Sequence, residues 1–261
     1  MLRDDWPMGR AERLVPCVLV PHYNHDRQIR PVIAALGKLG LPVIVIDDGS
    51  APESFKSLGD SVASLPWVSL HREPQNSGKG AAVMCGLRIA AAQGYSHAVQ
   101  VDADGQHCIA DIPALLDLAR EHPESLVSGS PVYDATVPSA RLHGRKISLF
   151  WTRLETWSKD IEDPMCGFRV YPVASVIALV ADHEPGAGME FDAEILVRAH
   201  WAGMPLKFIR TAVTYPAGGL SHFRMFRDNV RISTMHTRLF FGMVRRIPVL
   251  IARRLREKGQ A

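Results

Sequence analysis

Residues 98–107 of this chain read AVQVDADGQH, a largely apolar run that ends in two aspartates, Asp102 and Asp104. If the run forms a β-strand, both carboxylates lie at or just beyond its carboxyl end, where ligands bind in an open α/β sheet. Two carboxylates this close repel each other, so we expect a cation to hold them. Mg²⁺ or Mn²⁺ fits, because hard cations bind carboxylates and leave coordination positions open for phosphate oxygens. Alternatively, the two aspartates belong to a turn that caps a helix starting near Asp111.

Two earlier apolar runs also end in polar motifs. Residues 15–20 (VPCVLV) lead into PHYNH at 21–25, and residues 43–46 (VIVI) lead into DDGS at 47–50. A weaker apolar run follows at 68–70. Helical patterns separate these runs, and this alternation predicts an α/β fold with a doubly wound, mostly parallel sheet. Because the carboxyl ends of parallel strands meet at one edge, the polar motifs at three strand ends predict a single crevice.

The periodicity of the remaining segments predicts further elements. We expect helices at 27–39, with Asp26 as N-cap, and at 76–92, 112–121, 139–157, 173–181 and 189–201. Further strands are expected at 126–128, 168–171, 206–209 and 212–215. The helix that opens at NSGKG (76–80) carries small residues and Lys79, which suit a phosphate-rich ligand bound by backbone N–H groups and the helix dipole. Neither a Walker A motif nor G-x-G-x-x-G is present.

The composition is that of an ordinary globular protein, with 261 residues, 47% of them hydrophobic. The four cysteines are scattered without a CxxC pair, which favours reduced thiols in a cytosolic protein over a disulfide framework or a zinc site. Residues 1–13 are polar and are interpreted as a leader without the apolar core of a signal peptide. No uncharged apolar run reaches the roughly 18 residues of a membrane span.

The charge is distributed unevenly. Residues 207–261 hold 12 Lys and Arg against two acids, a net charge of +10, whereas residues 1–206 carry −7. This basic end indicates an anionic partner. From residue 223 the pattern is helical, with one face formed by Arg224, Arg227, Arg231, Arg238 and Arg245 and the opposite face by Phe226, Val230, Phe240 and Val244. Either the helix packs on the domain with a solvated arginine face, or it lies on anionic lipid headgroups.

Five motifs together resemble those of family 2 glycosyltransferases, in the same order along the chain. They are PHYN (21–24), IDDGS (46–50), NSGKG (76–80), DADGQH (102–107) and GFR (167–169). The resemblance covers residues 14–220 and is to the branch with dolichyl- and polyprenyl-phosphate mannosyltransferases. It implies a GT-A fold with a nucleotide-sugar half (14–130) and an acceptor half (131–220), followed by a basic amphipathic helical tail (221–261). It also implies inverting transfer from a nucleoside diphosphate sugar, with Mg²⁺ or Mn²⁺ as cofactor.

The resemblance assigns roles residue by residue. Nucleotide-sugar contacts would come from Pro21, Tyr23, Asn24, Asp48, Lys79, Asp102 and Arg141. The metal ligands would be Asp102, Asp104 and Gln106, with His222 as an additional ligand. Asp163 and Arg169 would face the acceptor. A general base would come from Asp192 or Glu194 in FDAEIL (191–196); Glu190 and Glu194 share a helix face and Asp192 points away, so the choice stays open. A phosphate acceptor would need no base, and a solvated helix face is the alternative for all three acids.

The chain departs from that branch after residue 217, where transmembrane helices often follow. Here GGLSHFR (218–224) leads into the arginine-rich helix, a tail similar to that of bacterial enzymes encoded beside, or fused to, lipid acyltransferases. We therefore expect a lipid or lipid-linked acceptor, an anionic membrane surface on the cytoplasmic side of the inner membrane, an acyltransferase partner, and no nucleic acid.

Two other functions remain open. A nucleotidyltransferase can use a similar sheet and metal, although it usually carries a glycine-rich basic loop where this chain has PHYNH. The other is a catalytically silent GT-A scaffold that partners a lipid-modifying enzyme, but every acidic motif residue is present.

Overall fold

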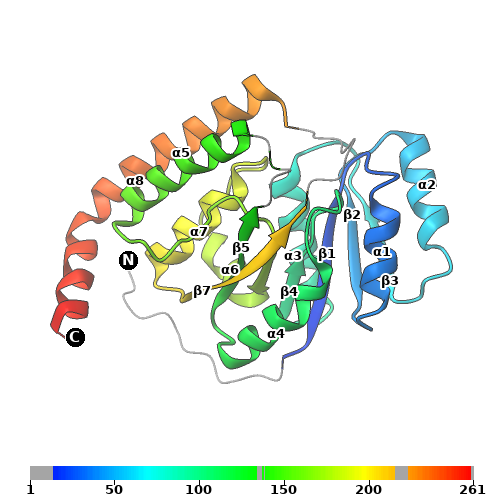
Figure 1. The fold of residues 1–261 in the computed structure, drawn as a ribbon, viewed down its shortest axis with the longest axis horizontal. Helices are drawn as coiled ribbons and strands as arrows, with labels where there is room; N and C mark the ends of the chain where they lie inside the picture. The colour runs from blue at the N-terminus through cyan, green and yellow to red at the C-terminus, as the bar shows by residue number, and fades with distance from the viewer. Residues whose placement is uncertain (1–13, 134–136, 138, 215–222, 260–261) are drawn as a thin grey trace.

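The computed structural model describes residues 14–133, 137, 139–214 and 223–259, and Figure 1 shows its arrangement. The strands are β1 (Pro16–His22), β2 (Val43–Asp47), β3 (Val68–Arg72), β4 (His97–Gln100), β5 (Leu126–Tyr133), β6 (Arg169–Pro172) and β7 (Leu206–Val213). The helices are α1 (Ile29–Gly37), α2 (Pro52–Val62), α3 (Lys79–Ala92), α4 (Ile112–Glu121), α5 (Ser139–Thr156), α6 (Val173–Val180), α7 (Phe191–Ala202) and α8 (Met225–Gly259). A short 3₁₀ turn, Ile109–Asp111, precedes α4.

The strands form one seven-stranded sheet in the order β3-β2-β1-β4-β6-β5-β7. All neighbouring strands are parallel except β6, which runs antiparallel to β4 and β5. The expected mostly parallel α/β sheet is therefore confirmed. The expected border between the two halves at residue 130 falls inside β5, so segments on both sides of that border contribute to the same sheet.

Helices cover both faces of the sheet, which explains why its central strands read as continuous apolar runs. On one face, Leu19 and Ile44 pack with buried residues of α3, α6 and α7. On the other, Val18 and Val45 pack with buried residues of α1, α2 and α4. This double cover fixes the strand ends, and therefore the polar motifs that follow them, at one edge of a rigid core.

Two expectations about local structure are wrong. The first helix begins at Ile29, not at residue 27, and Asp26 does not cap it, because its carboxylate accepts a hydrogen bond from the hydroxyl of Ser54 in α2. The segments 206–209 and 212–215 are not two strands, because β7 runs unbroken to Val213. β7 lies at the edge of the sheet, and its side chains alternate between the two faces: Arg210 is exposed and Thr211 is buried. The polar residues at 210 and 211 therefore do not end the strand. No element was predicted for α2.

The long helix α8 packs along α5 and α7 with a face that neither interpretation of its sequence predicted (Figure 1). Its buried residues Met235 and Leu239 pack with Ala193 and Val197 of α7. The expected packing face is exposed instead, with Phe226 at 85%. Within the described part of the chain, no helix combines the length and apolarity needed to cross a bilayer.

Candidate active site

The polar motifs after β1, β2 and β4 lie at one edge of the sheet, as the sequence predicts. Strands β1 and β2 are parallel and in register up to the pair His22 and Asp47, and β4 lies on the other side of β1. Asp102 follows the last residue of β4 by two positions. The site is therefore built on the carboxyl ends of three adjacent strands, which is the ligand-binding edge of this class of sheet.

Lys79 bridges two carboxylates at this edge. Its ammonium lies 2.8 Å from Oδ2 of Asp102 and 2.8 Å from Oδ2 of Asp192. The lysine is the first residue of α3, and Asp192 lies in the first turn of α7. Three separate segments thus contribute one cation and two carboxylates to a single cluster. The other carboxylate oxygen of Asp192 is buried without a hydrogen-bond partner and lies 3.8 Å from the guanidinium of Arg169.

The charges in this cluster stabilise one another. Burial by itself would raise the pKa of Asp102, but the ammonium of Lys79, together with His107 and Gln100, outweighs burial and holds that pKa well below its usual range. Burial would likewise lower the pKa of Lys79, but the charges of Asp102 and Asp192 raise it. The pKa of Asp104 is raised, first by burial and then by the negative charge of Asp102. Asp102 and Lys79 are therefore ionised at neutral pH.

The donor set at this edge fits Mg²⁺ or Mn²⁺. Asp102 and Asp104 offer carboxylate oxygens, which hard cations prefer. Asp104 uses one oxygen to accept the backbone N–H of Gln106, at 3.0 Å, and this bond shapes the turn. Within the described residues, no three His, Cys, Asp or Glu side chains are arranged to hold a metal by themselves. A divalent cation here would take one or two carboxylates from the protein and its other ligands from phosphate and water, as Mg²⁺ usually does.

The alternative in which these aspartates cap the following helix is not observed. The first residues of α4 receive no side-chain cap, and Asp111 instead accepts a hydrogen bond from the hydroxyl of Thr211 at 2.6 Å. The two aspartates are held by the turn and by Lys79, so they remain directed at the site rather than at a helix end.

A chain of buried hydrogen bonds lies behind Asp102, and the sequence did not predict it. The hydroxyl of Tyr171 donates to the amide oxygen of Gln100, at 2.9 Å, and the amide nitrogen of Gln100 donates to Asp102, at 3.1 Å. His107 accepts the backbone N–H of Asp102 and stacks on Phe168. The available signal was Gln100 itself, a polar residue inside an apolar run, because such a residue is buried only when it has hydrogen-bond partners.

Gly167 fits against the cluster because it has no side chain. A Cβ at this position would lie 2.6 Å from the ammonium of Lys79 and 2.7 Å from the amide nitrogen of Gln100. Any larger residue would therefore displace the lysine that bridges Asp102 and Asp192. This close approach explains why the GFR motif has glycine at its first position.

Of the three acids around α7, only Asp192 belongs to the cluster. Glu190 accepts the backbone N–H of Gly188 at 3.0 Å, and Glu194 accepts that of Gly186 at 2.9 Å. Glu194 also forms an ion pair with Arg238 of α8 at 2.6 Å. The expectation that Glu194 faces an acceptor is therefore not supported, because one of its oxygens is engaged by Arg238 and the 186–188 loop and the other lies 3.5 Å from the guanidinium of Arg198 in α7.

Arg169 is a positioning residue, and the expectation that its side chain faces the acceptor is wrong. It is completely buried and donates to the backbone oxygens of Asp192, at 2.6 Å, and Pro164, at 3.0 Å. These bonds fix the start of α7 and the turn before β6. Arg169 therefore orients Asp192 from behind the site.

Asp163 forms an ion pair with Arg145 of α5. The guanidinium of Arg145 contacts both oxygens of Asp163, at 2.7 and 2.6 Å, and lies over the ring of Tyr133, 5.1 Å from its centroid. The carboxylate also accepts the backbone N–H of Met165. Because this guanidinium engages both of its oxygens, the carboxylate of Asp163 belongs to an ion pair and is not a free acid.

Two of the residues predicted to bind the nucleotide form hydrogen bonds with neighbouring loops. The carboxylate of Asp48 accepts the backbone N–H groups of Ser77 and Gly78, both at 2.8 Å, and the side-chain amide of Asn76. Asn24 accepts the backbone N–H of Ala51 at 2.9 Å. Asp48 and Asn24 therefore hold neighbouring loops in place. Pro21 is buried in β1, and Tyr23 is half-buried just after it.

Two backbone N–H groups at the start of α3 are already engaged and are not offered to a phosphate, contrary to the sequence-based expectation. Gly80 donates to the backbone oxygen of Gly188 and Ala81 to that of Ala187. Gly78 adopts a positive φ of 112°, and a Cβ there would lie 2.4 Å from the oxygen of Ala187. The 186–188 loop thus covers this helix end, and Lys79 reaches the site through its side chain.

Three further predictions are located as follows. Gln106 lies in the turn after Asp104, and its backbone oxygen accepts a hydrogen bond from the N–H of Thr214. Arg141 lies in the first turn of α5, but its side chain is outside what the structure describes. His222 lies outside the described residues altogether. The roles predicted for these residues remain predictions.

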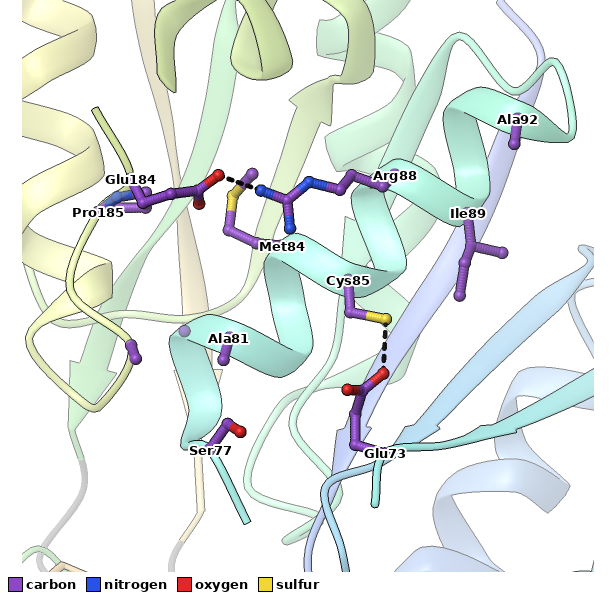
Figure 2. A pocket seen from close by; sticks show the side chains of 12 residues that line it. Glu73, Ser77, Ala81, Met84, Cys85, Arg88, Ile89, Ala92, Glu184 and Pro185 are labelled. Carbon is purple, nitrogen blue, oxygen red and sulfur yellow. Dashed lines mark hydrogen bonds and ion pairs between the residues drawn. The ribbon is translucent and has the colours of Figure 1, made fainter. Parts of the chain in front are cut away.

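A separate hollow of about 500 Å³ lies on the outer side of α3 (Figure 2). Its lining includes Arg88, which pairs with Glu184, and Cys85, whose thiol donates to Glu73 at 3.1 Å. Burial, followed by the neighbouring charge of Glu73, raises the pKa of this thiol to about 11. None of the predicted site residues lines this hollow, so it is distinct from the carboxylate cluster.

Comparison with known sequences gives a consistent match. The family described as glycosyl transferase family 2 matches residues 17–177. A polyprenol monophosphomannose synthase of Mycolicibacterium smegmatis is 26% identical over 222 residues, covering 82% of this chain and 82% of that protein. An undecaprenyl-phosphate mannosyltransferase of Micrococcus luteus is 24% identical over 225 residues, covering 79% of this chain and 86% of that protein.

Solved structures share the fold. A glucosyl-3-phosphoglycerate synthase from Mycobacterium tuberculosis in complex with uridine diphosphate has a TM-score of 0.63 at 18% identity, covering 92% of this chain and 85% of that one. A mannosyltransferase from Pyrobaculum calidifontis in complex with GDP-Man and Mn²⁺ has a TM-score of 0.55 at 17% identity, covering 84% of this chain and 62% of that one. At such identities the likeness concerns the fold alone.

Proposed function

This chain belongs to glycosyl transferase family 2 and has the GT-A fold of that family, and from this premise we propose that it transfers a sugar, with inversion, from a nucleoside diphosphate sugar to a lipid or lipid-linked acceptor. Two relatives that align over most of the chain are named for sugar transfer to polyprenyl phosphates. Family membership also argues against the nucleotidyltransferase alternative.

The observation that carries this proposal is the Asp102–Lys79–Asp192 cluster. Sugar transfer leaves negative charge on the departing diphosphate, and fixed positive groups stabilise that charge as it develops. Lys79 is an ammonium held in place by two carboxylates, so it does not need to reorganise during the reaction. The cluster lies at the edge where the nucleotide motifs PHYN and DDGS also end.

Asp102 and Asp104 are the residues that would hold a divalent cation. Such a cation supplies Lewis-acid stabilisation of the diphosphate charge when bound. The buried hydrogen bonds from Tyr171 to Gln100 and from Gln100 to Asp102 hold one oxygen of Asp102 and so orient its carboxylate. This arrangement supports metal dependence, which we include in the proposal.

Asp192 is the acid that we assign to the acceptor side. Its Oδ1 is buried without a hydrogen-bond partner, and Arg169 holds its backbone oxygen. Towards a hydroxyl acceptor, Asp192 would accept the proton as the oxygen attacks the anomeric carbon. A phosphate acceptor is already ionised and needs no base, so Asp192 would then act by holding Lys79. Arg145 lies on the side of α5, where its guanidinium is paired with the carboxylate of Asp163.

The acceptor class suggests where the enzyme works. We propose that it acts on the cytoplasmic side of the inner membrane as a peripheral protein, because its relatives are named for lipid-phosphate acceptors. The acyltransferase partner predicted from the tail stays a prediction.

A thermal-shift panel of nucleoside diphosphates, each with and without Mn²⁺, tests the donor and metal assignments. A ligand at 100 times its Kd adds about 2.7 kcal/mol, and a domain of this size gains about 2–4 °C per kcal/mol. We expect one nucleotide to raise the Tm by about 5–10 °C, and to do so only with Mn²⁺.

The matched variants are Asp104→Ala and Asp117→Ala. Asp104→Ala should remove the Mn²⁺-dependent shift while the protein stays folded, whereas Asp117 is an exposed acid on α4, away from the cluster, and its loss should change nothing. A parent protein that transfers no sugar and responds to no nucleotide would be a silent scaffold. Transfer by Asp104→Ala at the parental rate would show that the metal assignment is wrong.

A further inference from the structure

The outward side of α8 carries large apolar residues near both of its ends and in its middle, with the exposed polar residues Ser233 and Thr237 between Val230 and Phe241. Six of its large apolar residues are 44–85% exposed: Phe226, Val230, Phe241, Val244, Ile251 and Leu255. At 100° per residue, these six positions fall within about 80° of one another around the helix axis. They form an apolar stripe that is separate from the buried face of Met235, Leu239, Met243 and Leu250.

Helix α5 extends this stripe sideways. Ile147 and Phe150 of α5 are 61% and 63% exposed. A row of ring contacts connects the two helices: Phe150 with Trp151, Trp151 with Phe240, and Phe240 with Phe241, at centroid distances of 5.8, 6.4 and 5.8 Å. Because the rings at both ends of this row are exposed, the two helices share one apolar surface, which we term the α5–α8 band.

Basic residues border the band on both of its long edges. On α8, Arg227 and Arg245 are exposed and lie beside the apolar stripe. On α5, Lys146 and Arg153 are exposed and lie beside Phe150, on the side away from α8.

The described acidic side chains of these two helices do not offset that charge. Asp228 is buried and accepts the backbone N–H of Arg224, and Glu155 is buried and bonded to His236 at 2.9 Å. Among the described side chains of α5 and α8, none of the exposed ones is a carboxylate. The pattern of aromatic and aliphatic residues flanked by cations is that of helices that lie in the headgroup region of a bilayer.

We propose that the α5–α8 band docks onto an anionic membrane surface, with both helices lying in the plane of the headgroups. The apolar residues enter the boundary of the acyl chains, and the four basic residues meet the lipid phosphates. The biological meaning of this docking rests on the proposed function, but binding to the bilayer does not depend on sugar transfer.

The residues that we assign to the membrane contact are not those of the arginine face expected from the sequence. Arg238 is engaged by Glu194 inside the fold, and a Cβ on Gly188 would lie 2.7 Å from the guanidinium of Arg231, so that arginine also faces the body of the protein. The membrane contact therefore belongs to the apolar stripe and its two basic edges.

Co-sedimentation of the full chain with vesicles tests the proposal. Vesicles of phosphatidylcholine alone are compared with vesicles that also contain phosphatidylglycerol, at low and high salt. We expect binding to the anionic vesicles that weakens at high salt, because the attraction decays within a Debye length. A parent protein that ignores lipid charge, or does not bind, overturns the proposal.

Two double variants separate the two contributions. Arg227→Gln with Arg245→Gln should weaken binding to anionic vesicles about 25-fold, since each basic residue contributes about fivefold. Phe150→Ser with Phe241→Ser should weaken it about tenfold or more at both salt concentrations.

Lys56→Gln with Arg120→Gln removes the same charge from α2 and α4, away from the band (Figure 1), and should leave binding unchanged. Equal loss in this control pair would show that net charge alone is responsible.

A second copy of this chain is the alternative partner for the α5–α8 band. If the parent protein is a dimer in sedimentation velocity, becomes a monomer on Phe150→Ser with Phe241→Ser, and does not bind vesicles, the band joins two copies and the proposal is wrong. Donor hydrolysis without lipid should be retained in all of these variants. If the parent protein itself does not hydrolyse a donor, the proposed function is contradicted. Vesicle binding tests the α5–α8 band independently of that activity.

Discussion

Replacing Lys79 with methionine should destabilise the protein through the two carboxylates that it leaves behind. The ammonium lies 2.8 Å from both Asp102 and Asp192, and the three side chains are only 14%, 21% and 6% exposed. Removing one partner of a buried ion pair costs about 3–5 kcal/mol. Because Asp102 keeps some contact with water, we expect about 3 kcal/mol, or a Tm lower by about 6–12 °C.

The loss should depend on pH in a defined direction. In the parent, burial would raise the pKa of Asp102, but Lys79, together with His107 and Gln100, holds it below its usual range. A carboxyl whose folded-state pKa is lowered contributes stability above its unfolded pKa, and that stability is lost as the pH falls through the folded pKa. In the variant, burial acts without the ammonium, so the pKa of Asp102 rises above its usual range. The difference between parent and variant is therefore full at pH 7 and shrinks as the pH falls towards about 4.

Urea denaturation, followed by tryptophan fluorescence at pH 7 and pH 5, measures this difference. Lys56→Met is the matched control, because Lys56 also lies 2.8 Å from a carboxylate, that of Asp60, but both side chains are exposed. Such surface pairs contribute little, so this control should be indistinguishable from the parent. The reasoning is refuted if the two variants behave alike, or if the loss in Lys79→Met is the same at both pH values.

Two other predictions concern the same cluster. Gly167→Ala should lower stability by about 1–3 kcal/mol and weaken donor binding, because its Cβ would displace Lys79. Gly144→Ala, in the interior of α5 with open space around it, should instead stabilise by about 0.5–1 kcal/mol in the same melts. Asp192→Asn should reduce the rate of sugar transfer with little change in Tm. Glu194→Gln should lower the Tm and leave the rate unchanged, since it loosens the ion pair with Arg238; the opposite pattern would exchange their roles.

The sequence by itself determined the sheet and the edge that carries the site. The apolar runs before PHYNH, DDGS and DADGQH are long enough to be strands covered on both faces, and each ends in polar residues. Parallel strands place their carboxyl ends together, so the convergence of these motifs follows from pattern alone. The helix limits at 112–121 and near 139–156 were also readable, because their apolar residues recur with the helical period.

The tertiary structure alone decided which acid joins the site. Along α7, the helical period separates Asp192 from Glu194, but it does not say which side faces the sheet edge. That choice is made by Arg169, which holds the start of α7, and by Arg238, which draws Glu194 towards α8. The bridge from Lys79 to Asp192 spans 113 positions in the chain, and no local pattern encodes a contact at that separation.

The same limit applies to α8. Its sequence offers an apolar face, an arginine face and a third, mixed face, and periodicity identifies all of them equally well. The fold selected the face of Met235 and Leu239, because those side chains fit against Ala193 and Val197 of α7. Packing depends on the shape of the neighbouring surface as well as on hydrophobicity, so which apolar stripe stayed exposed was settled only when the helices came together.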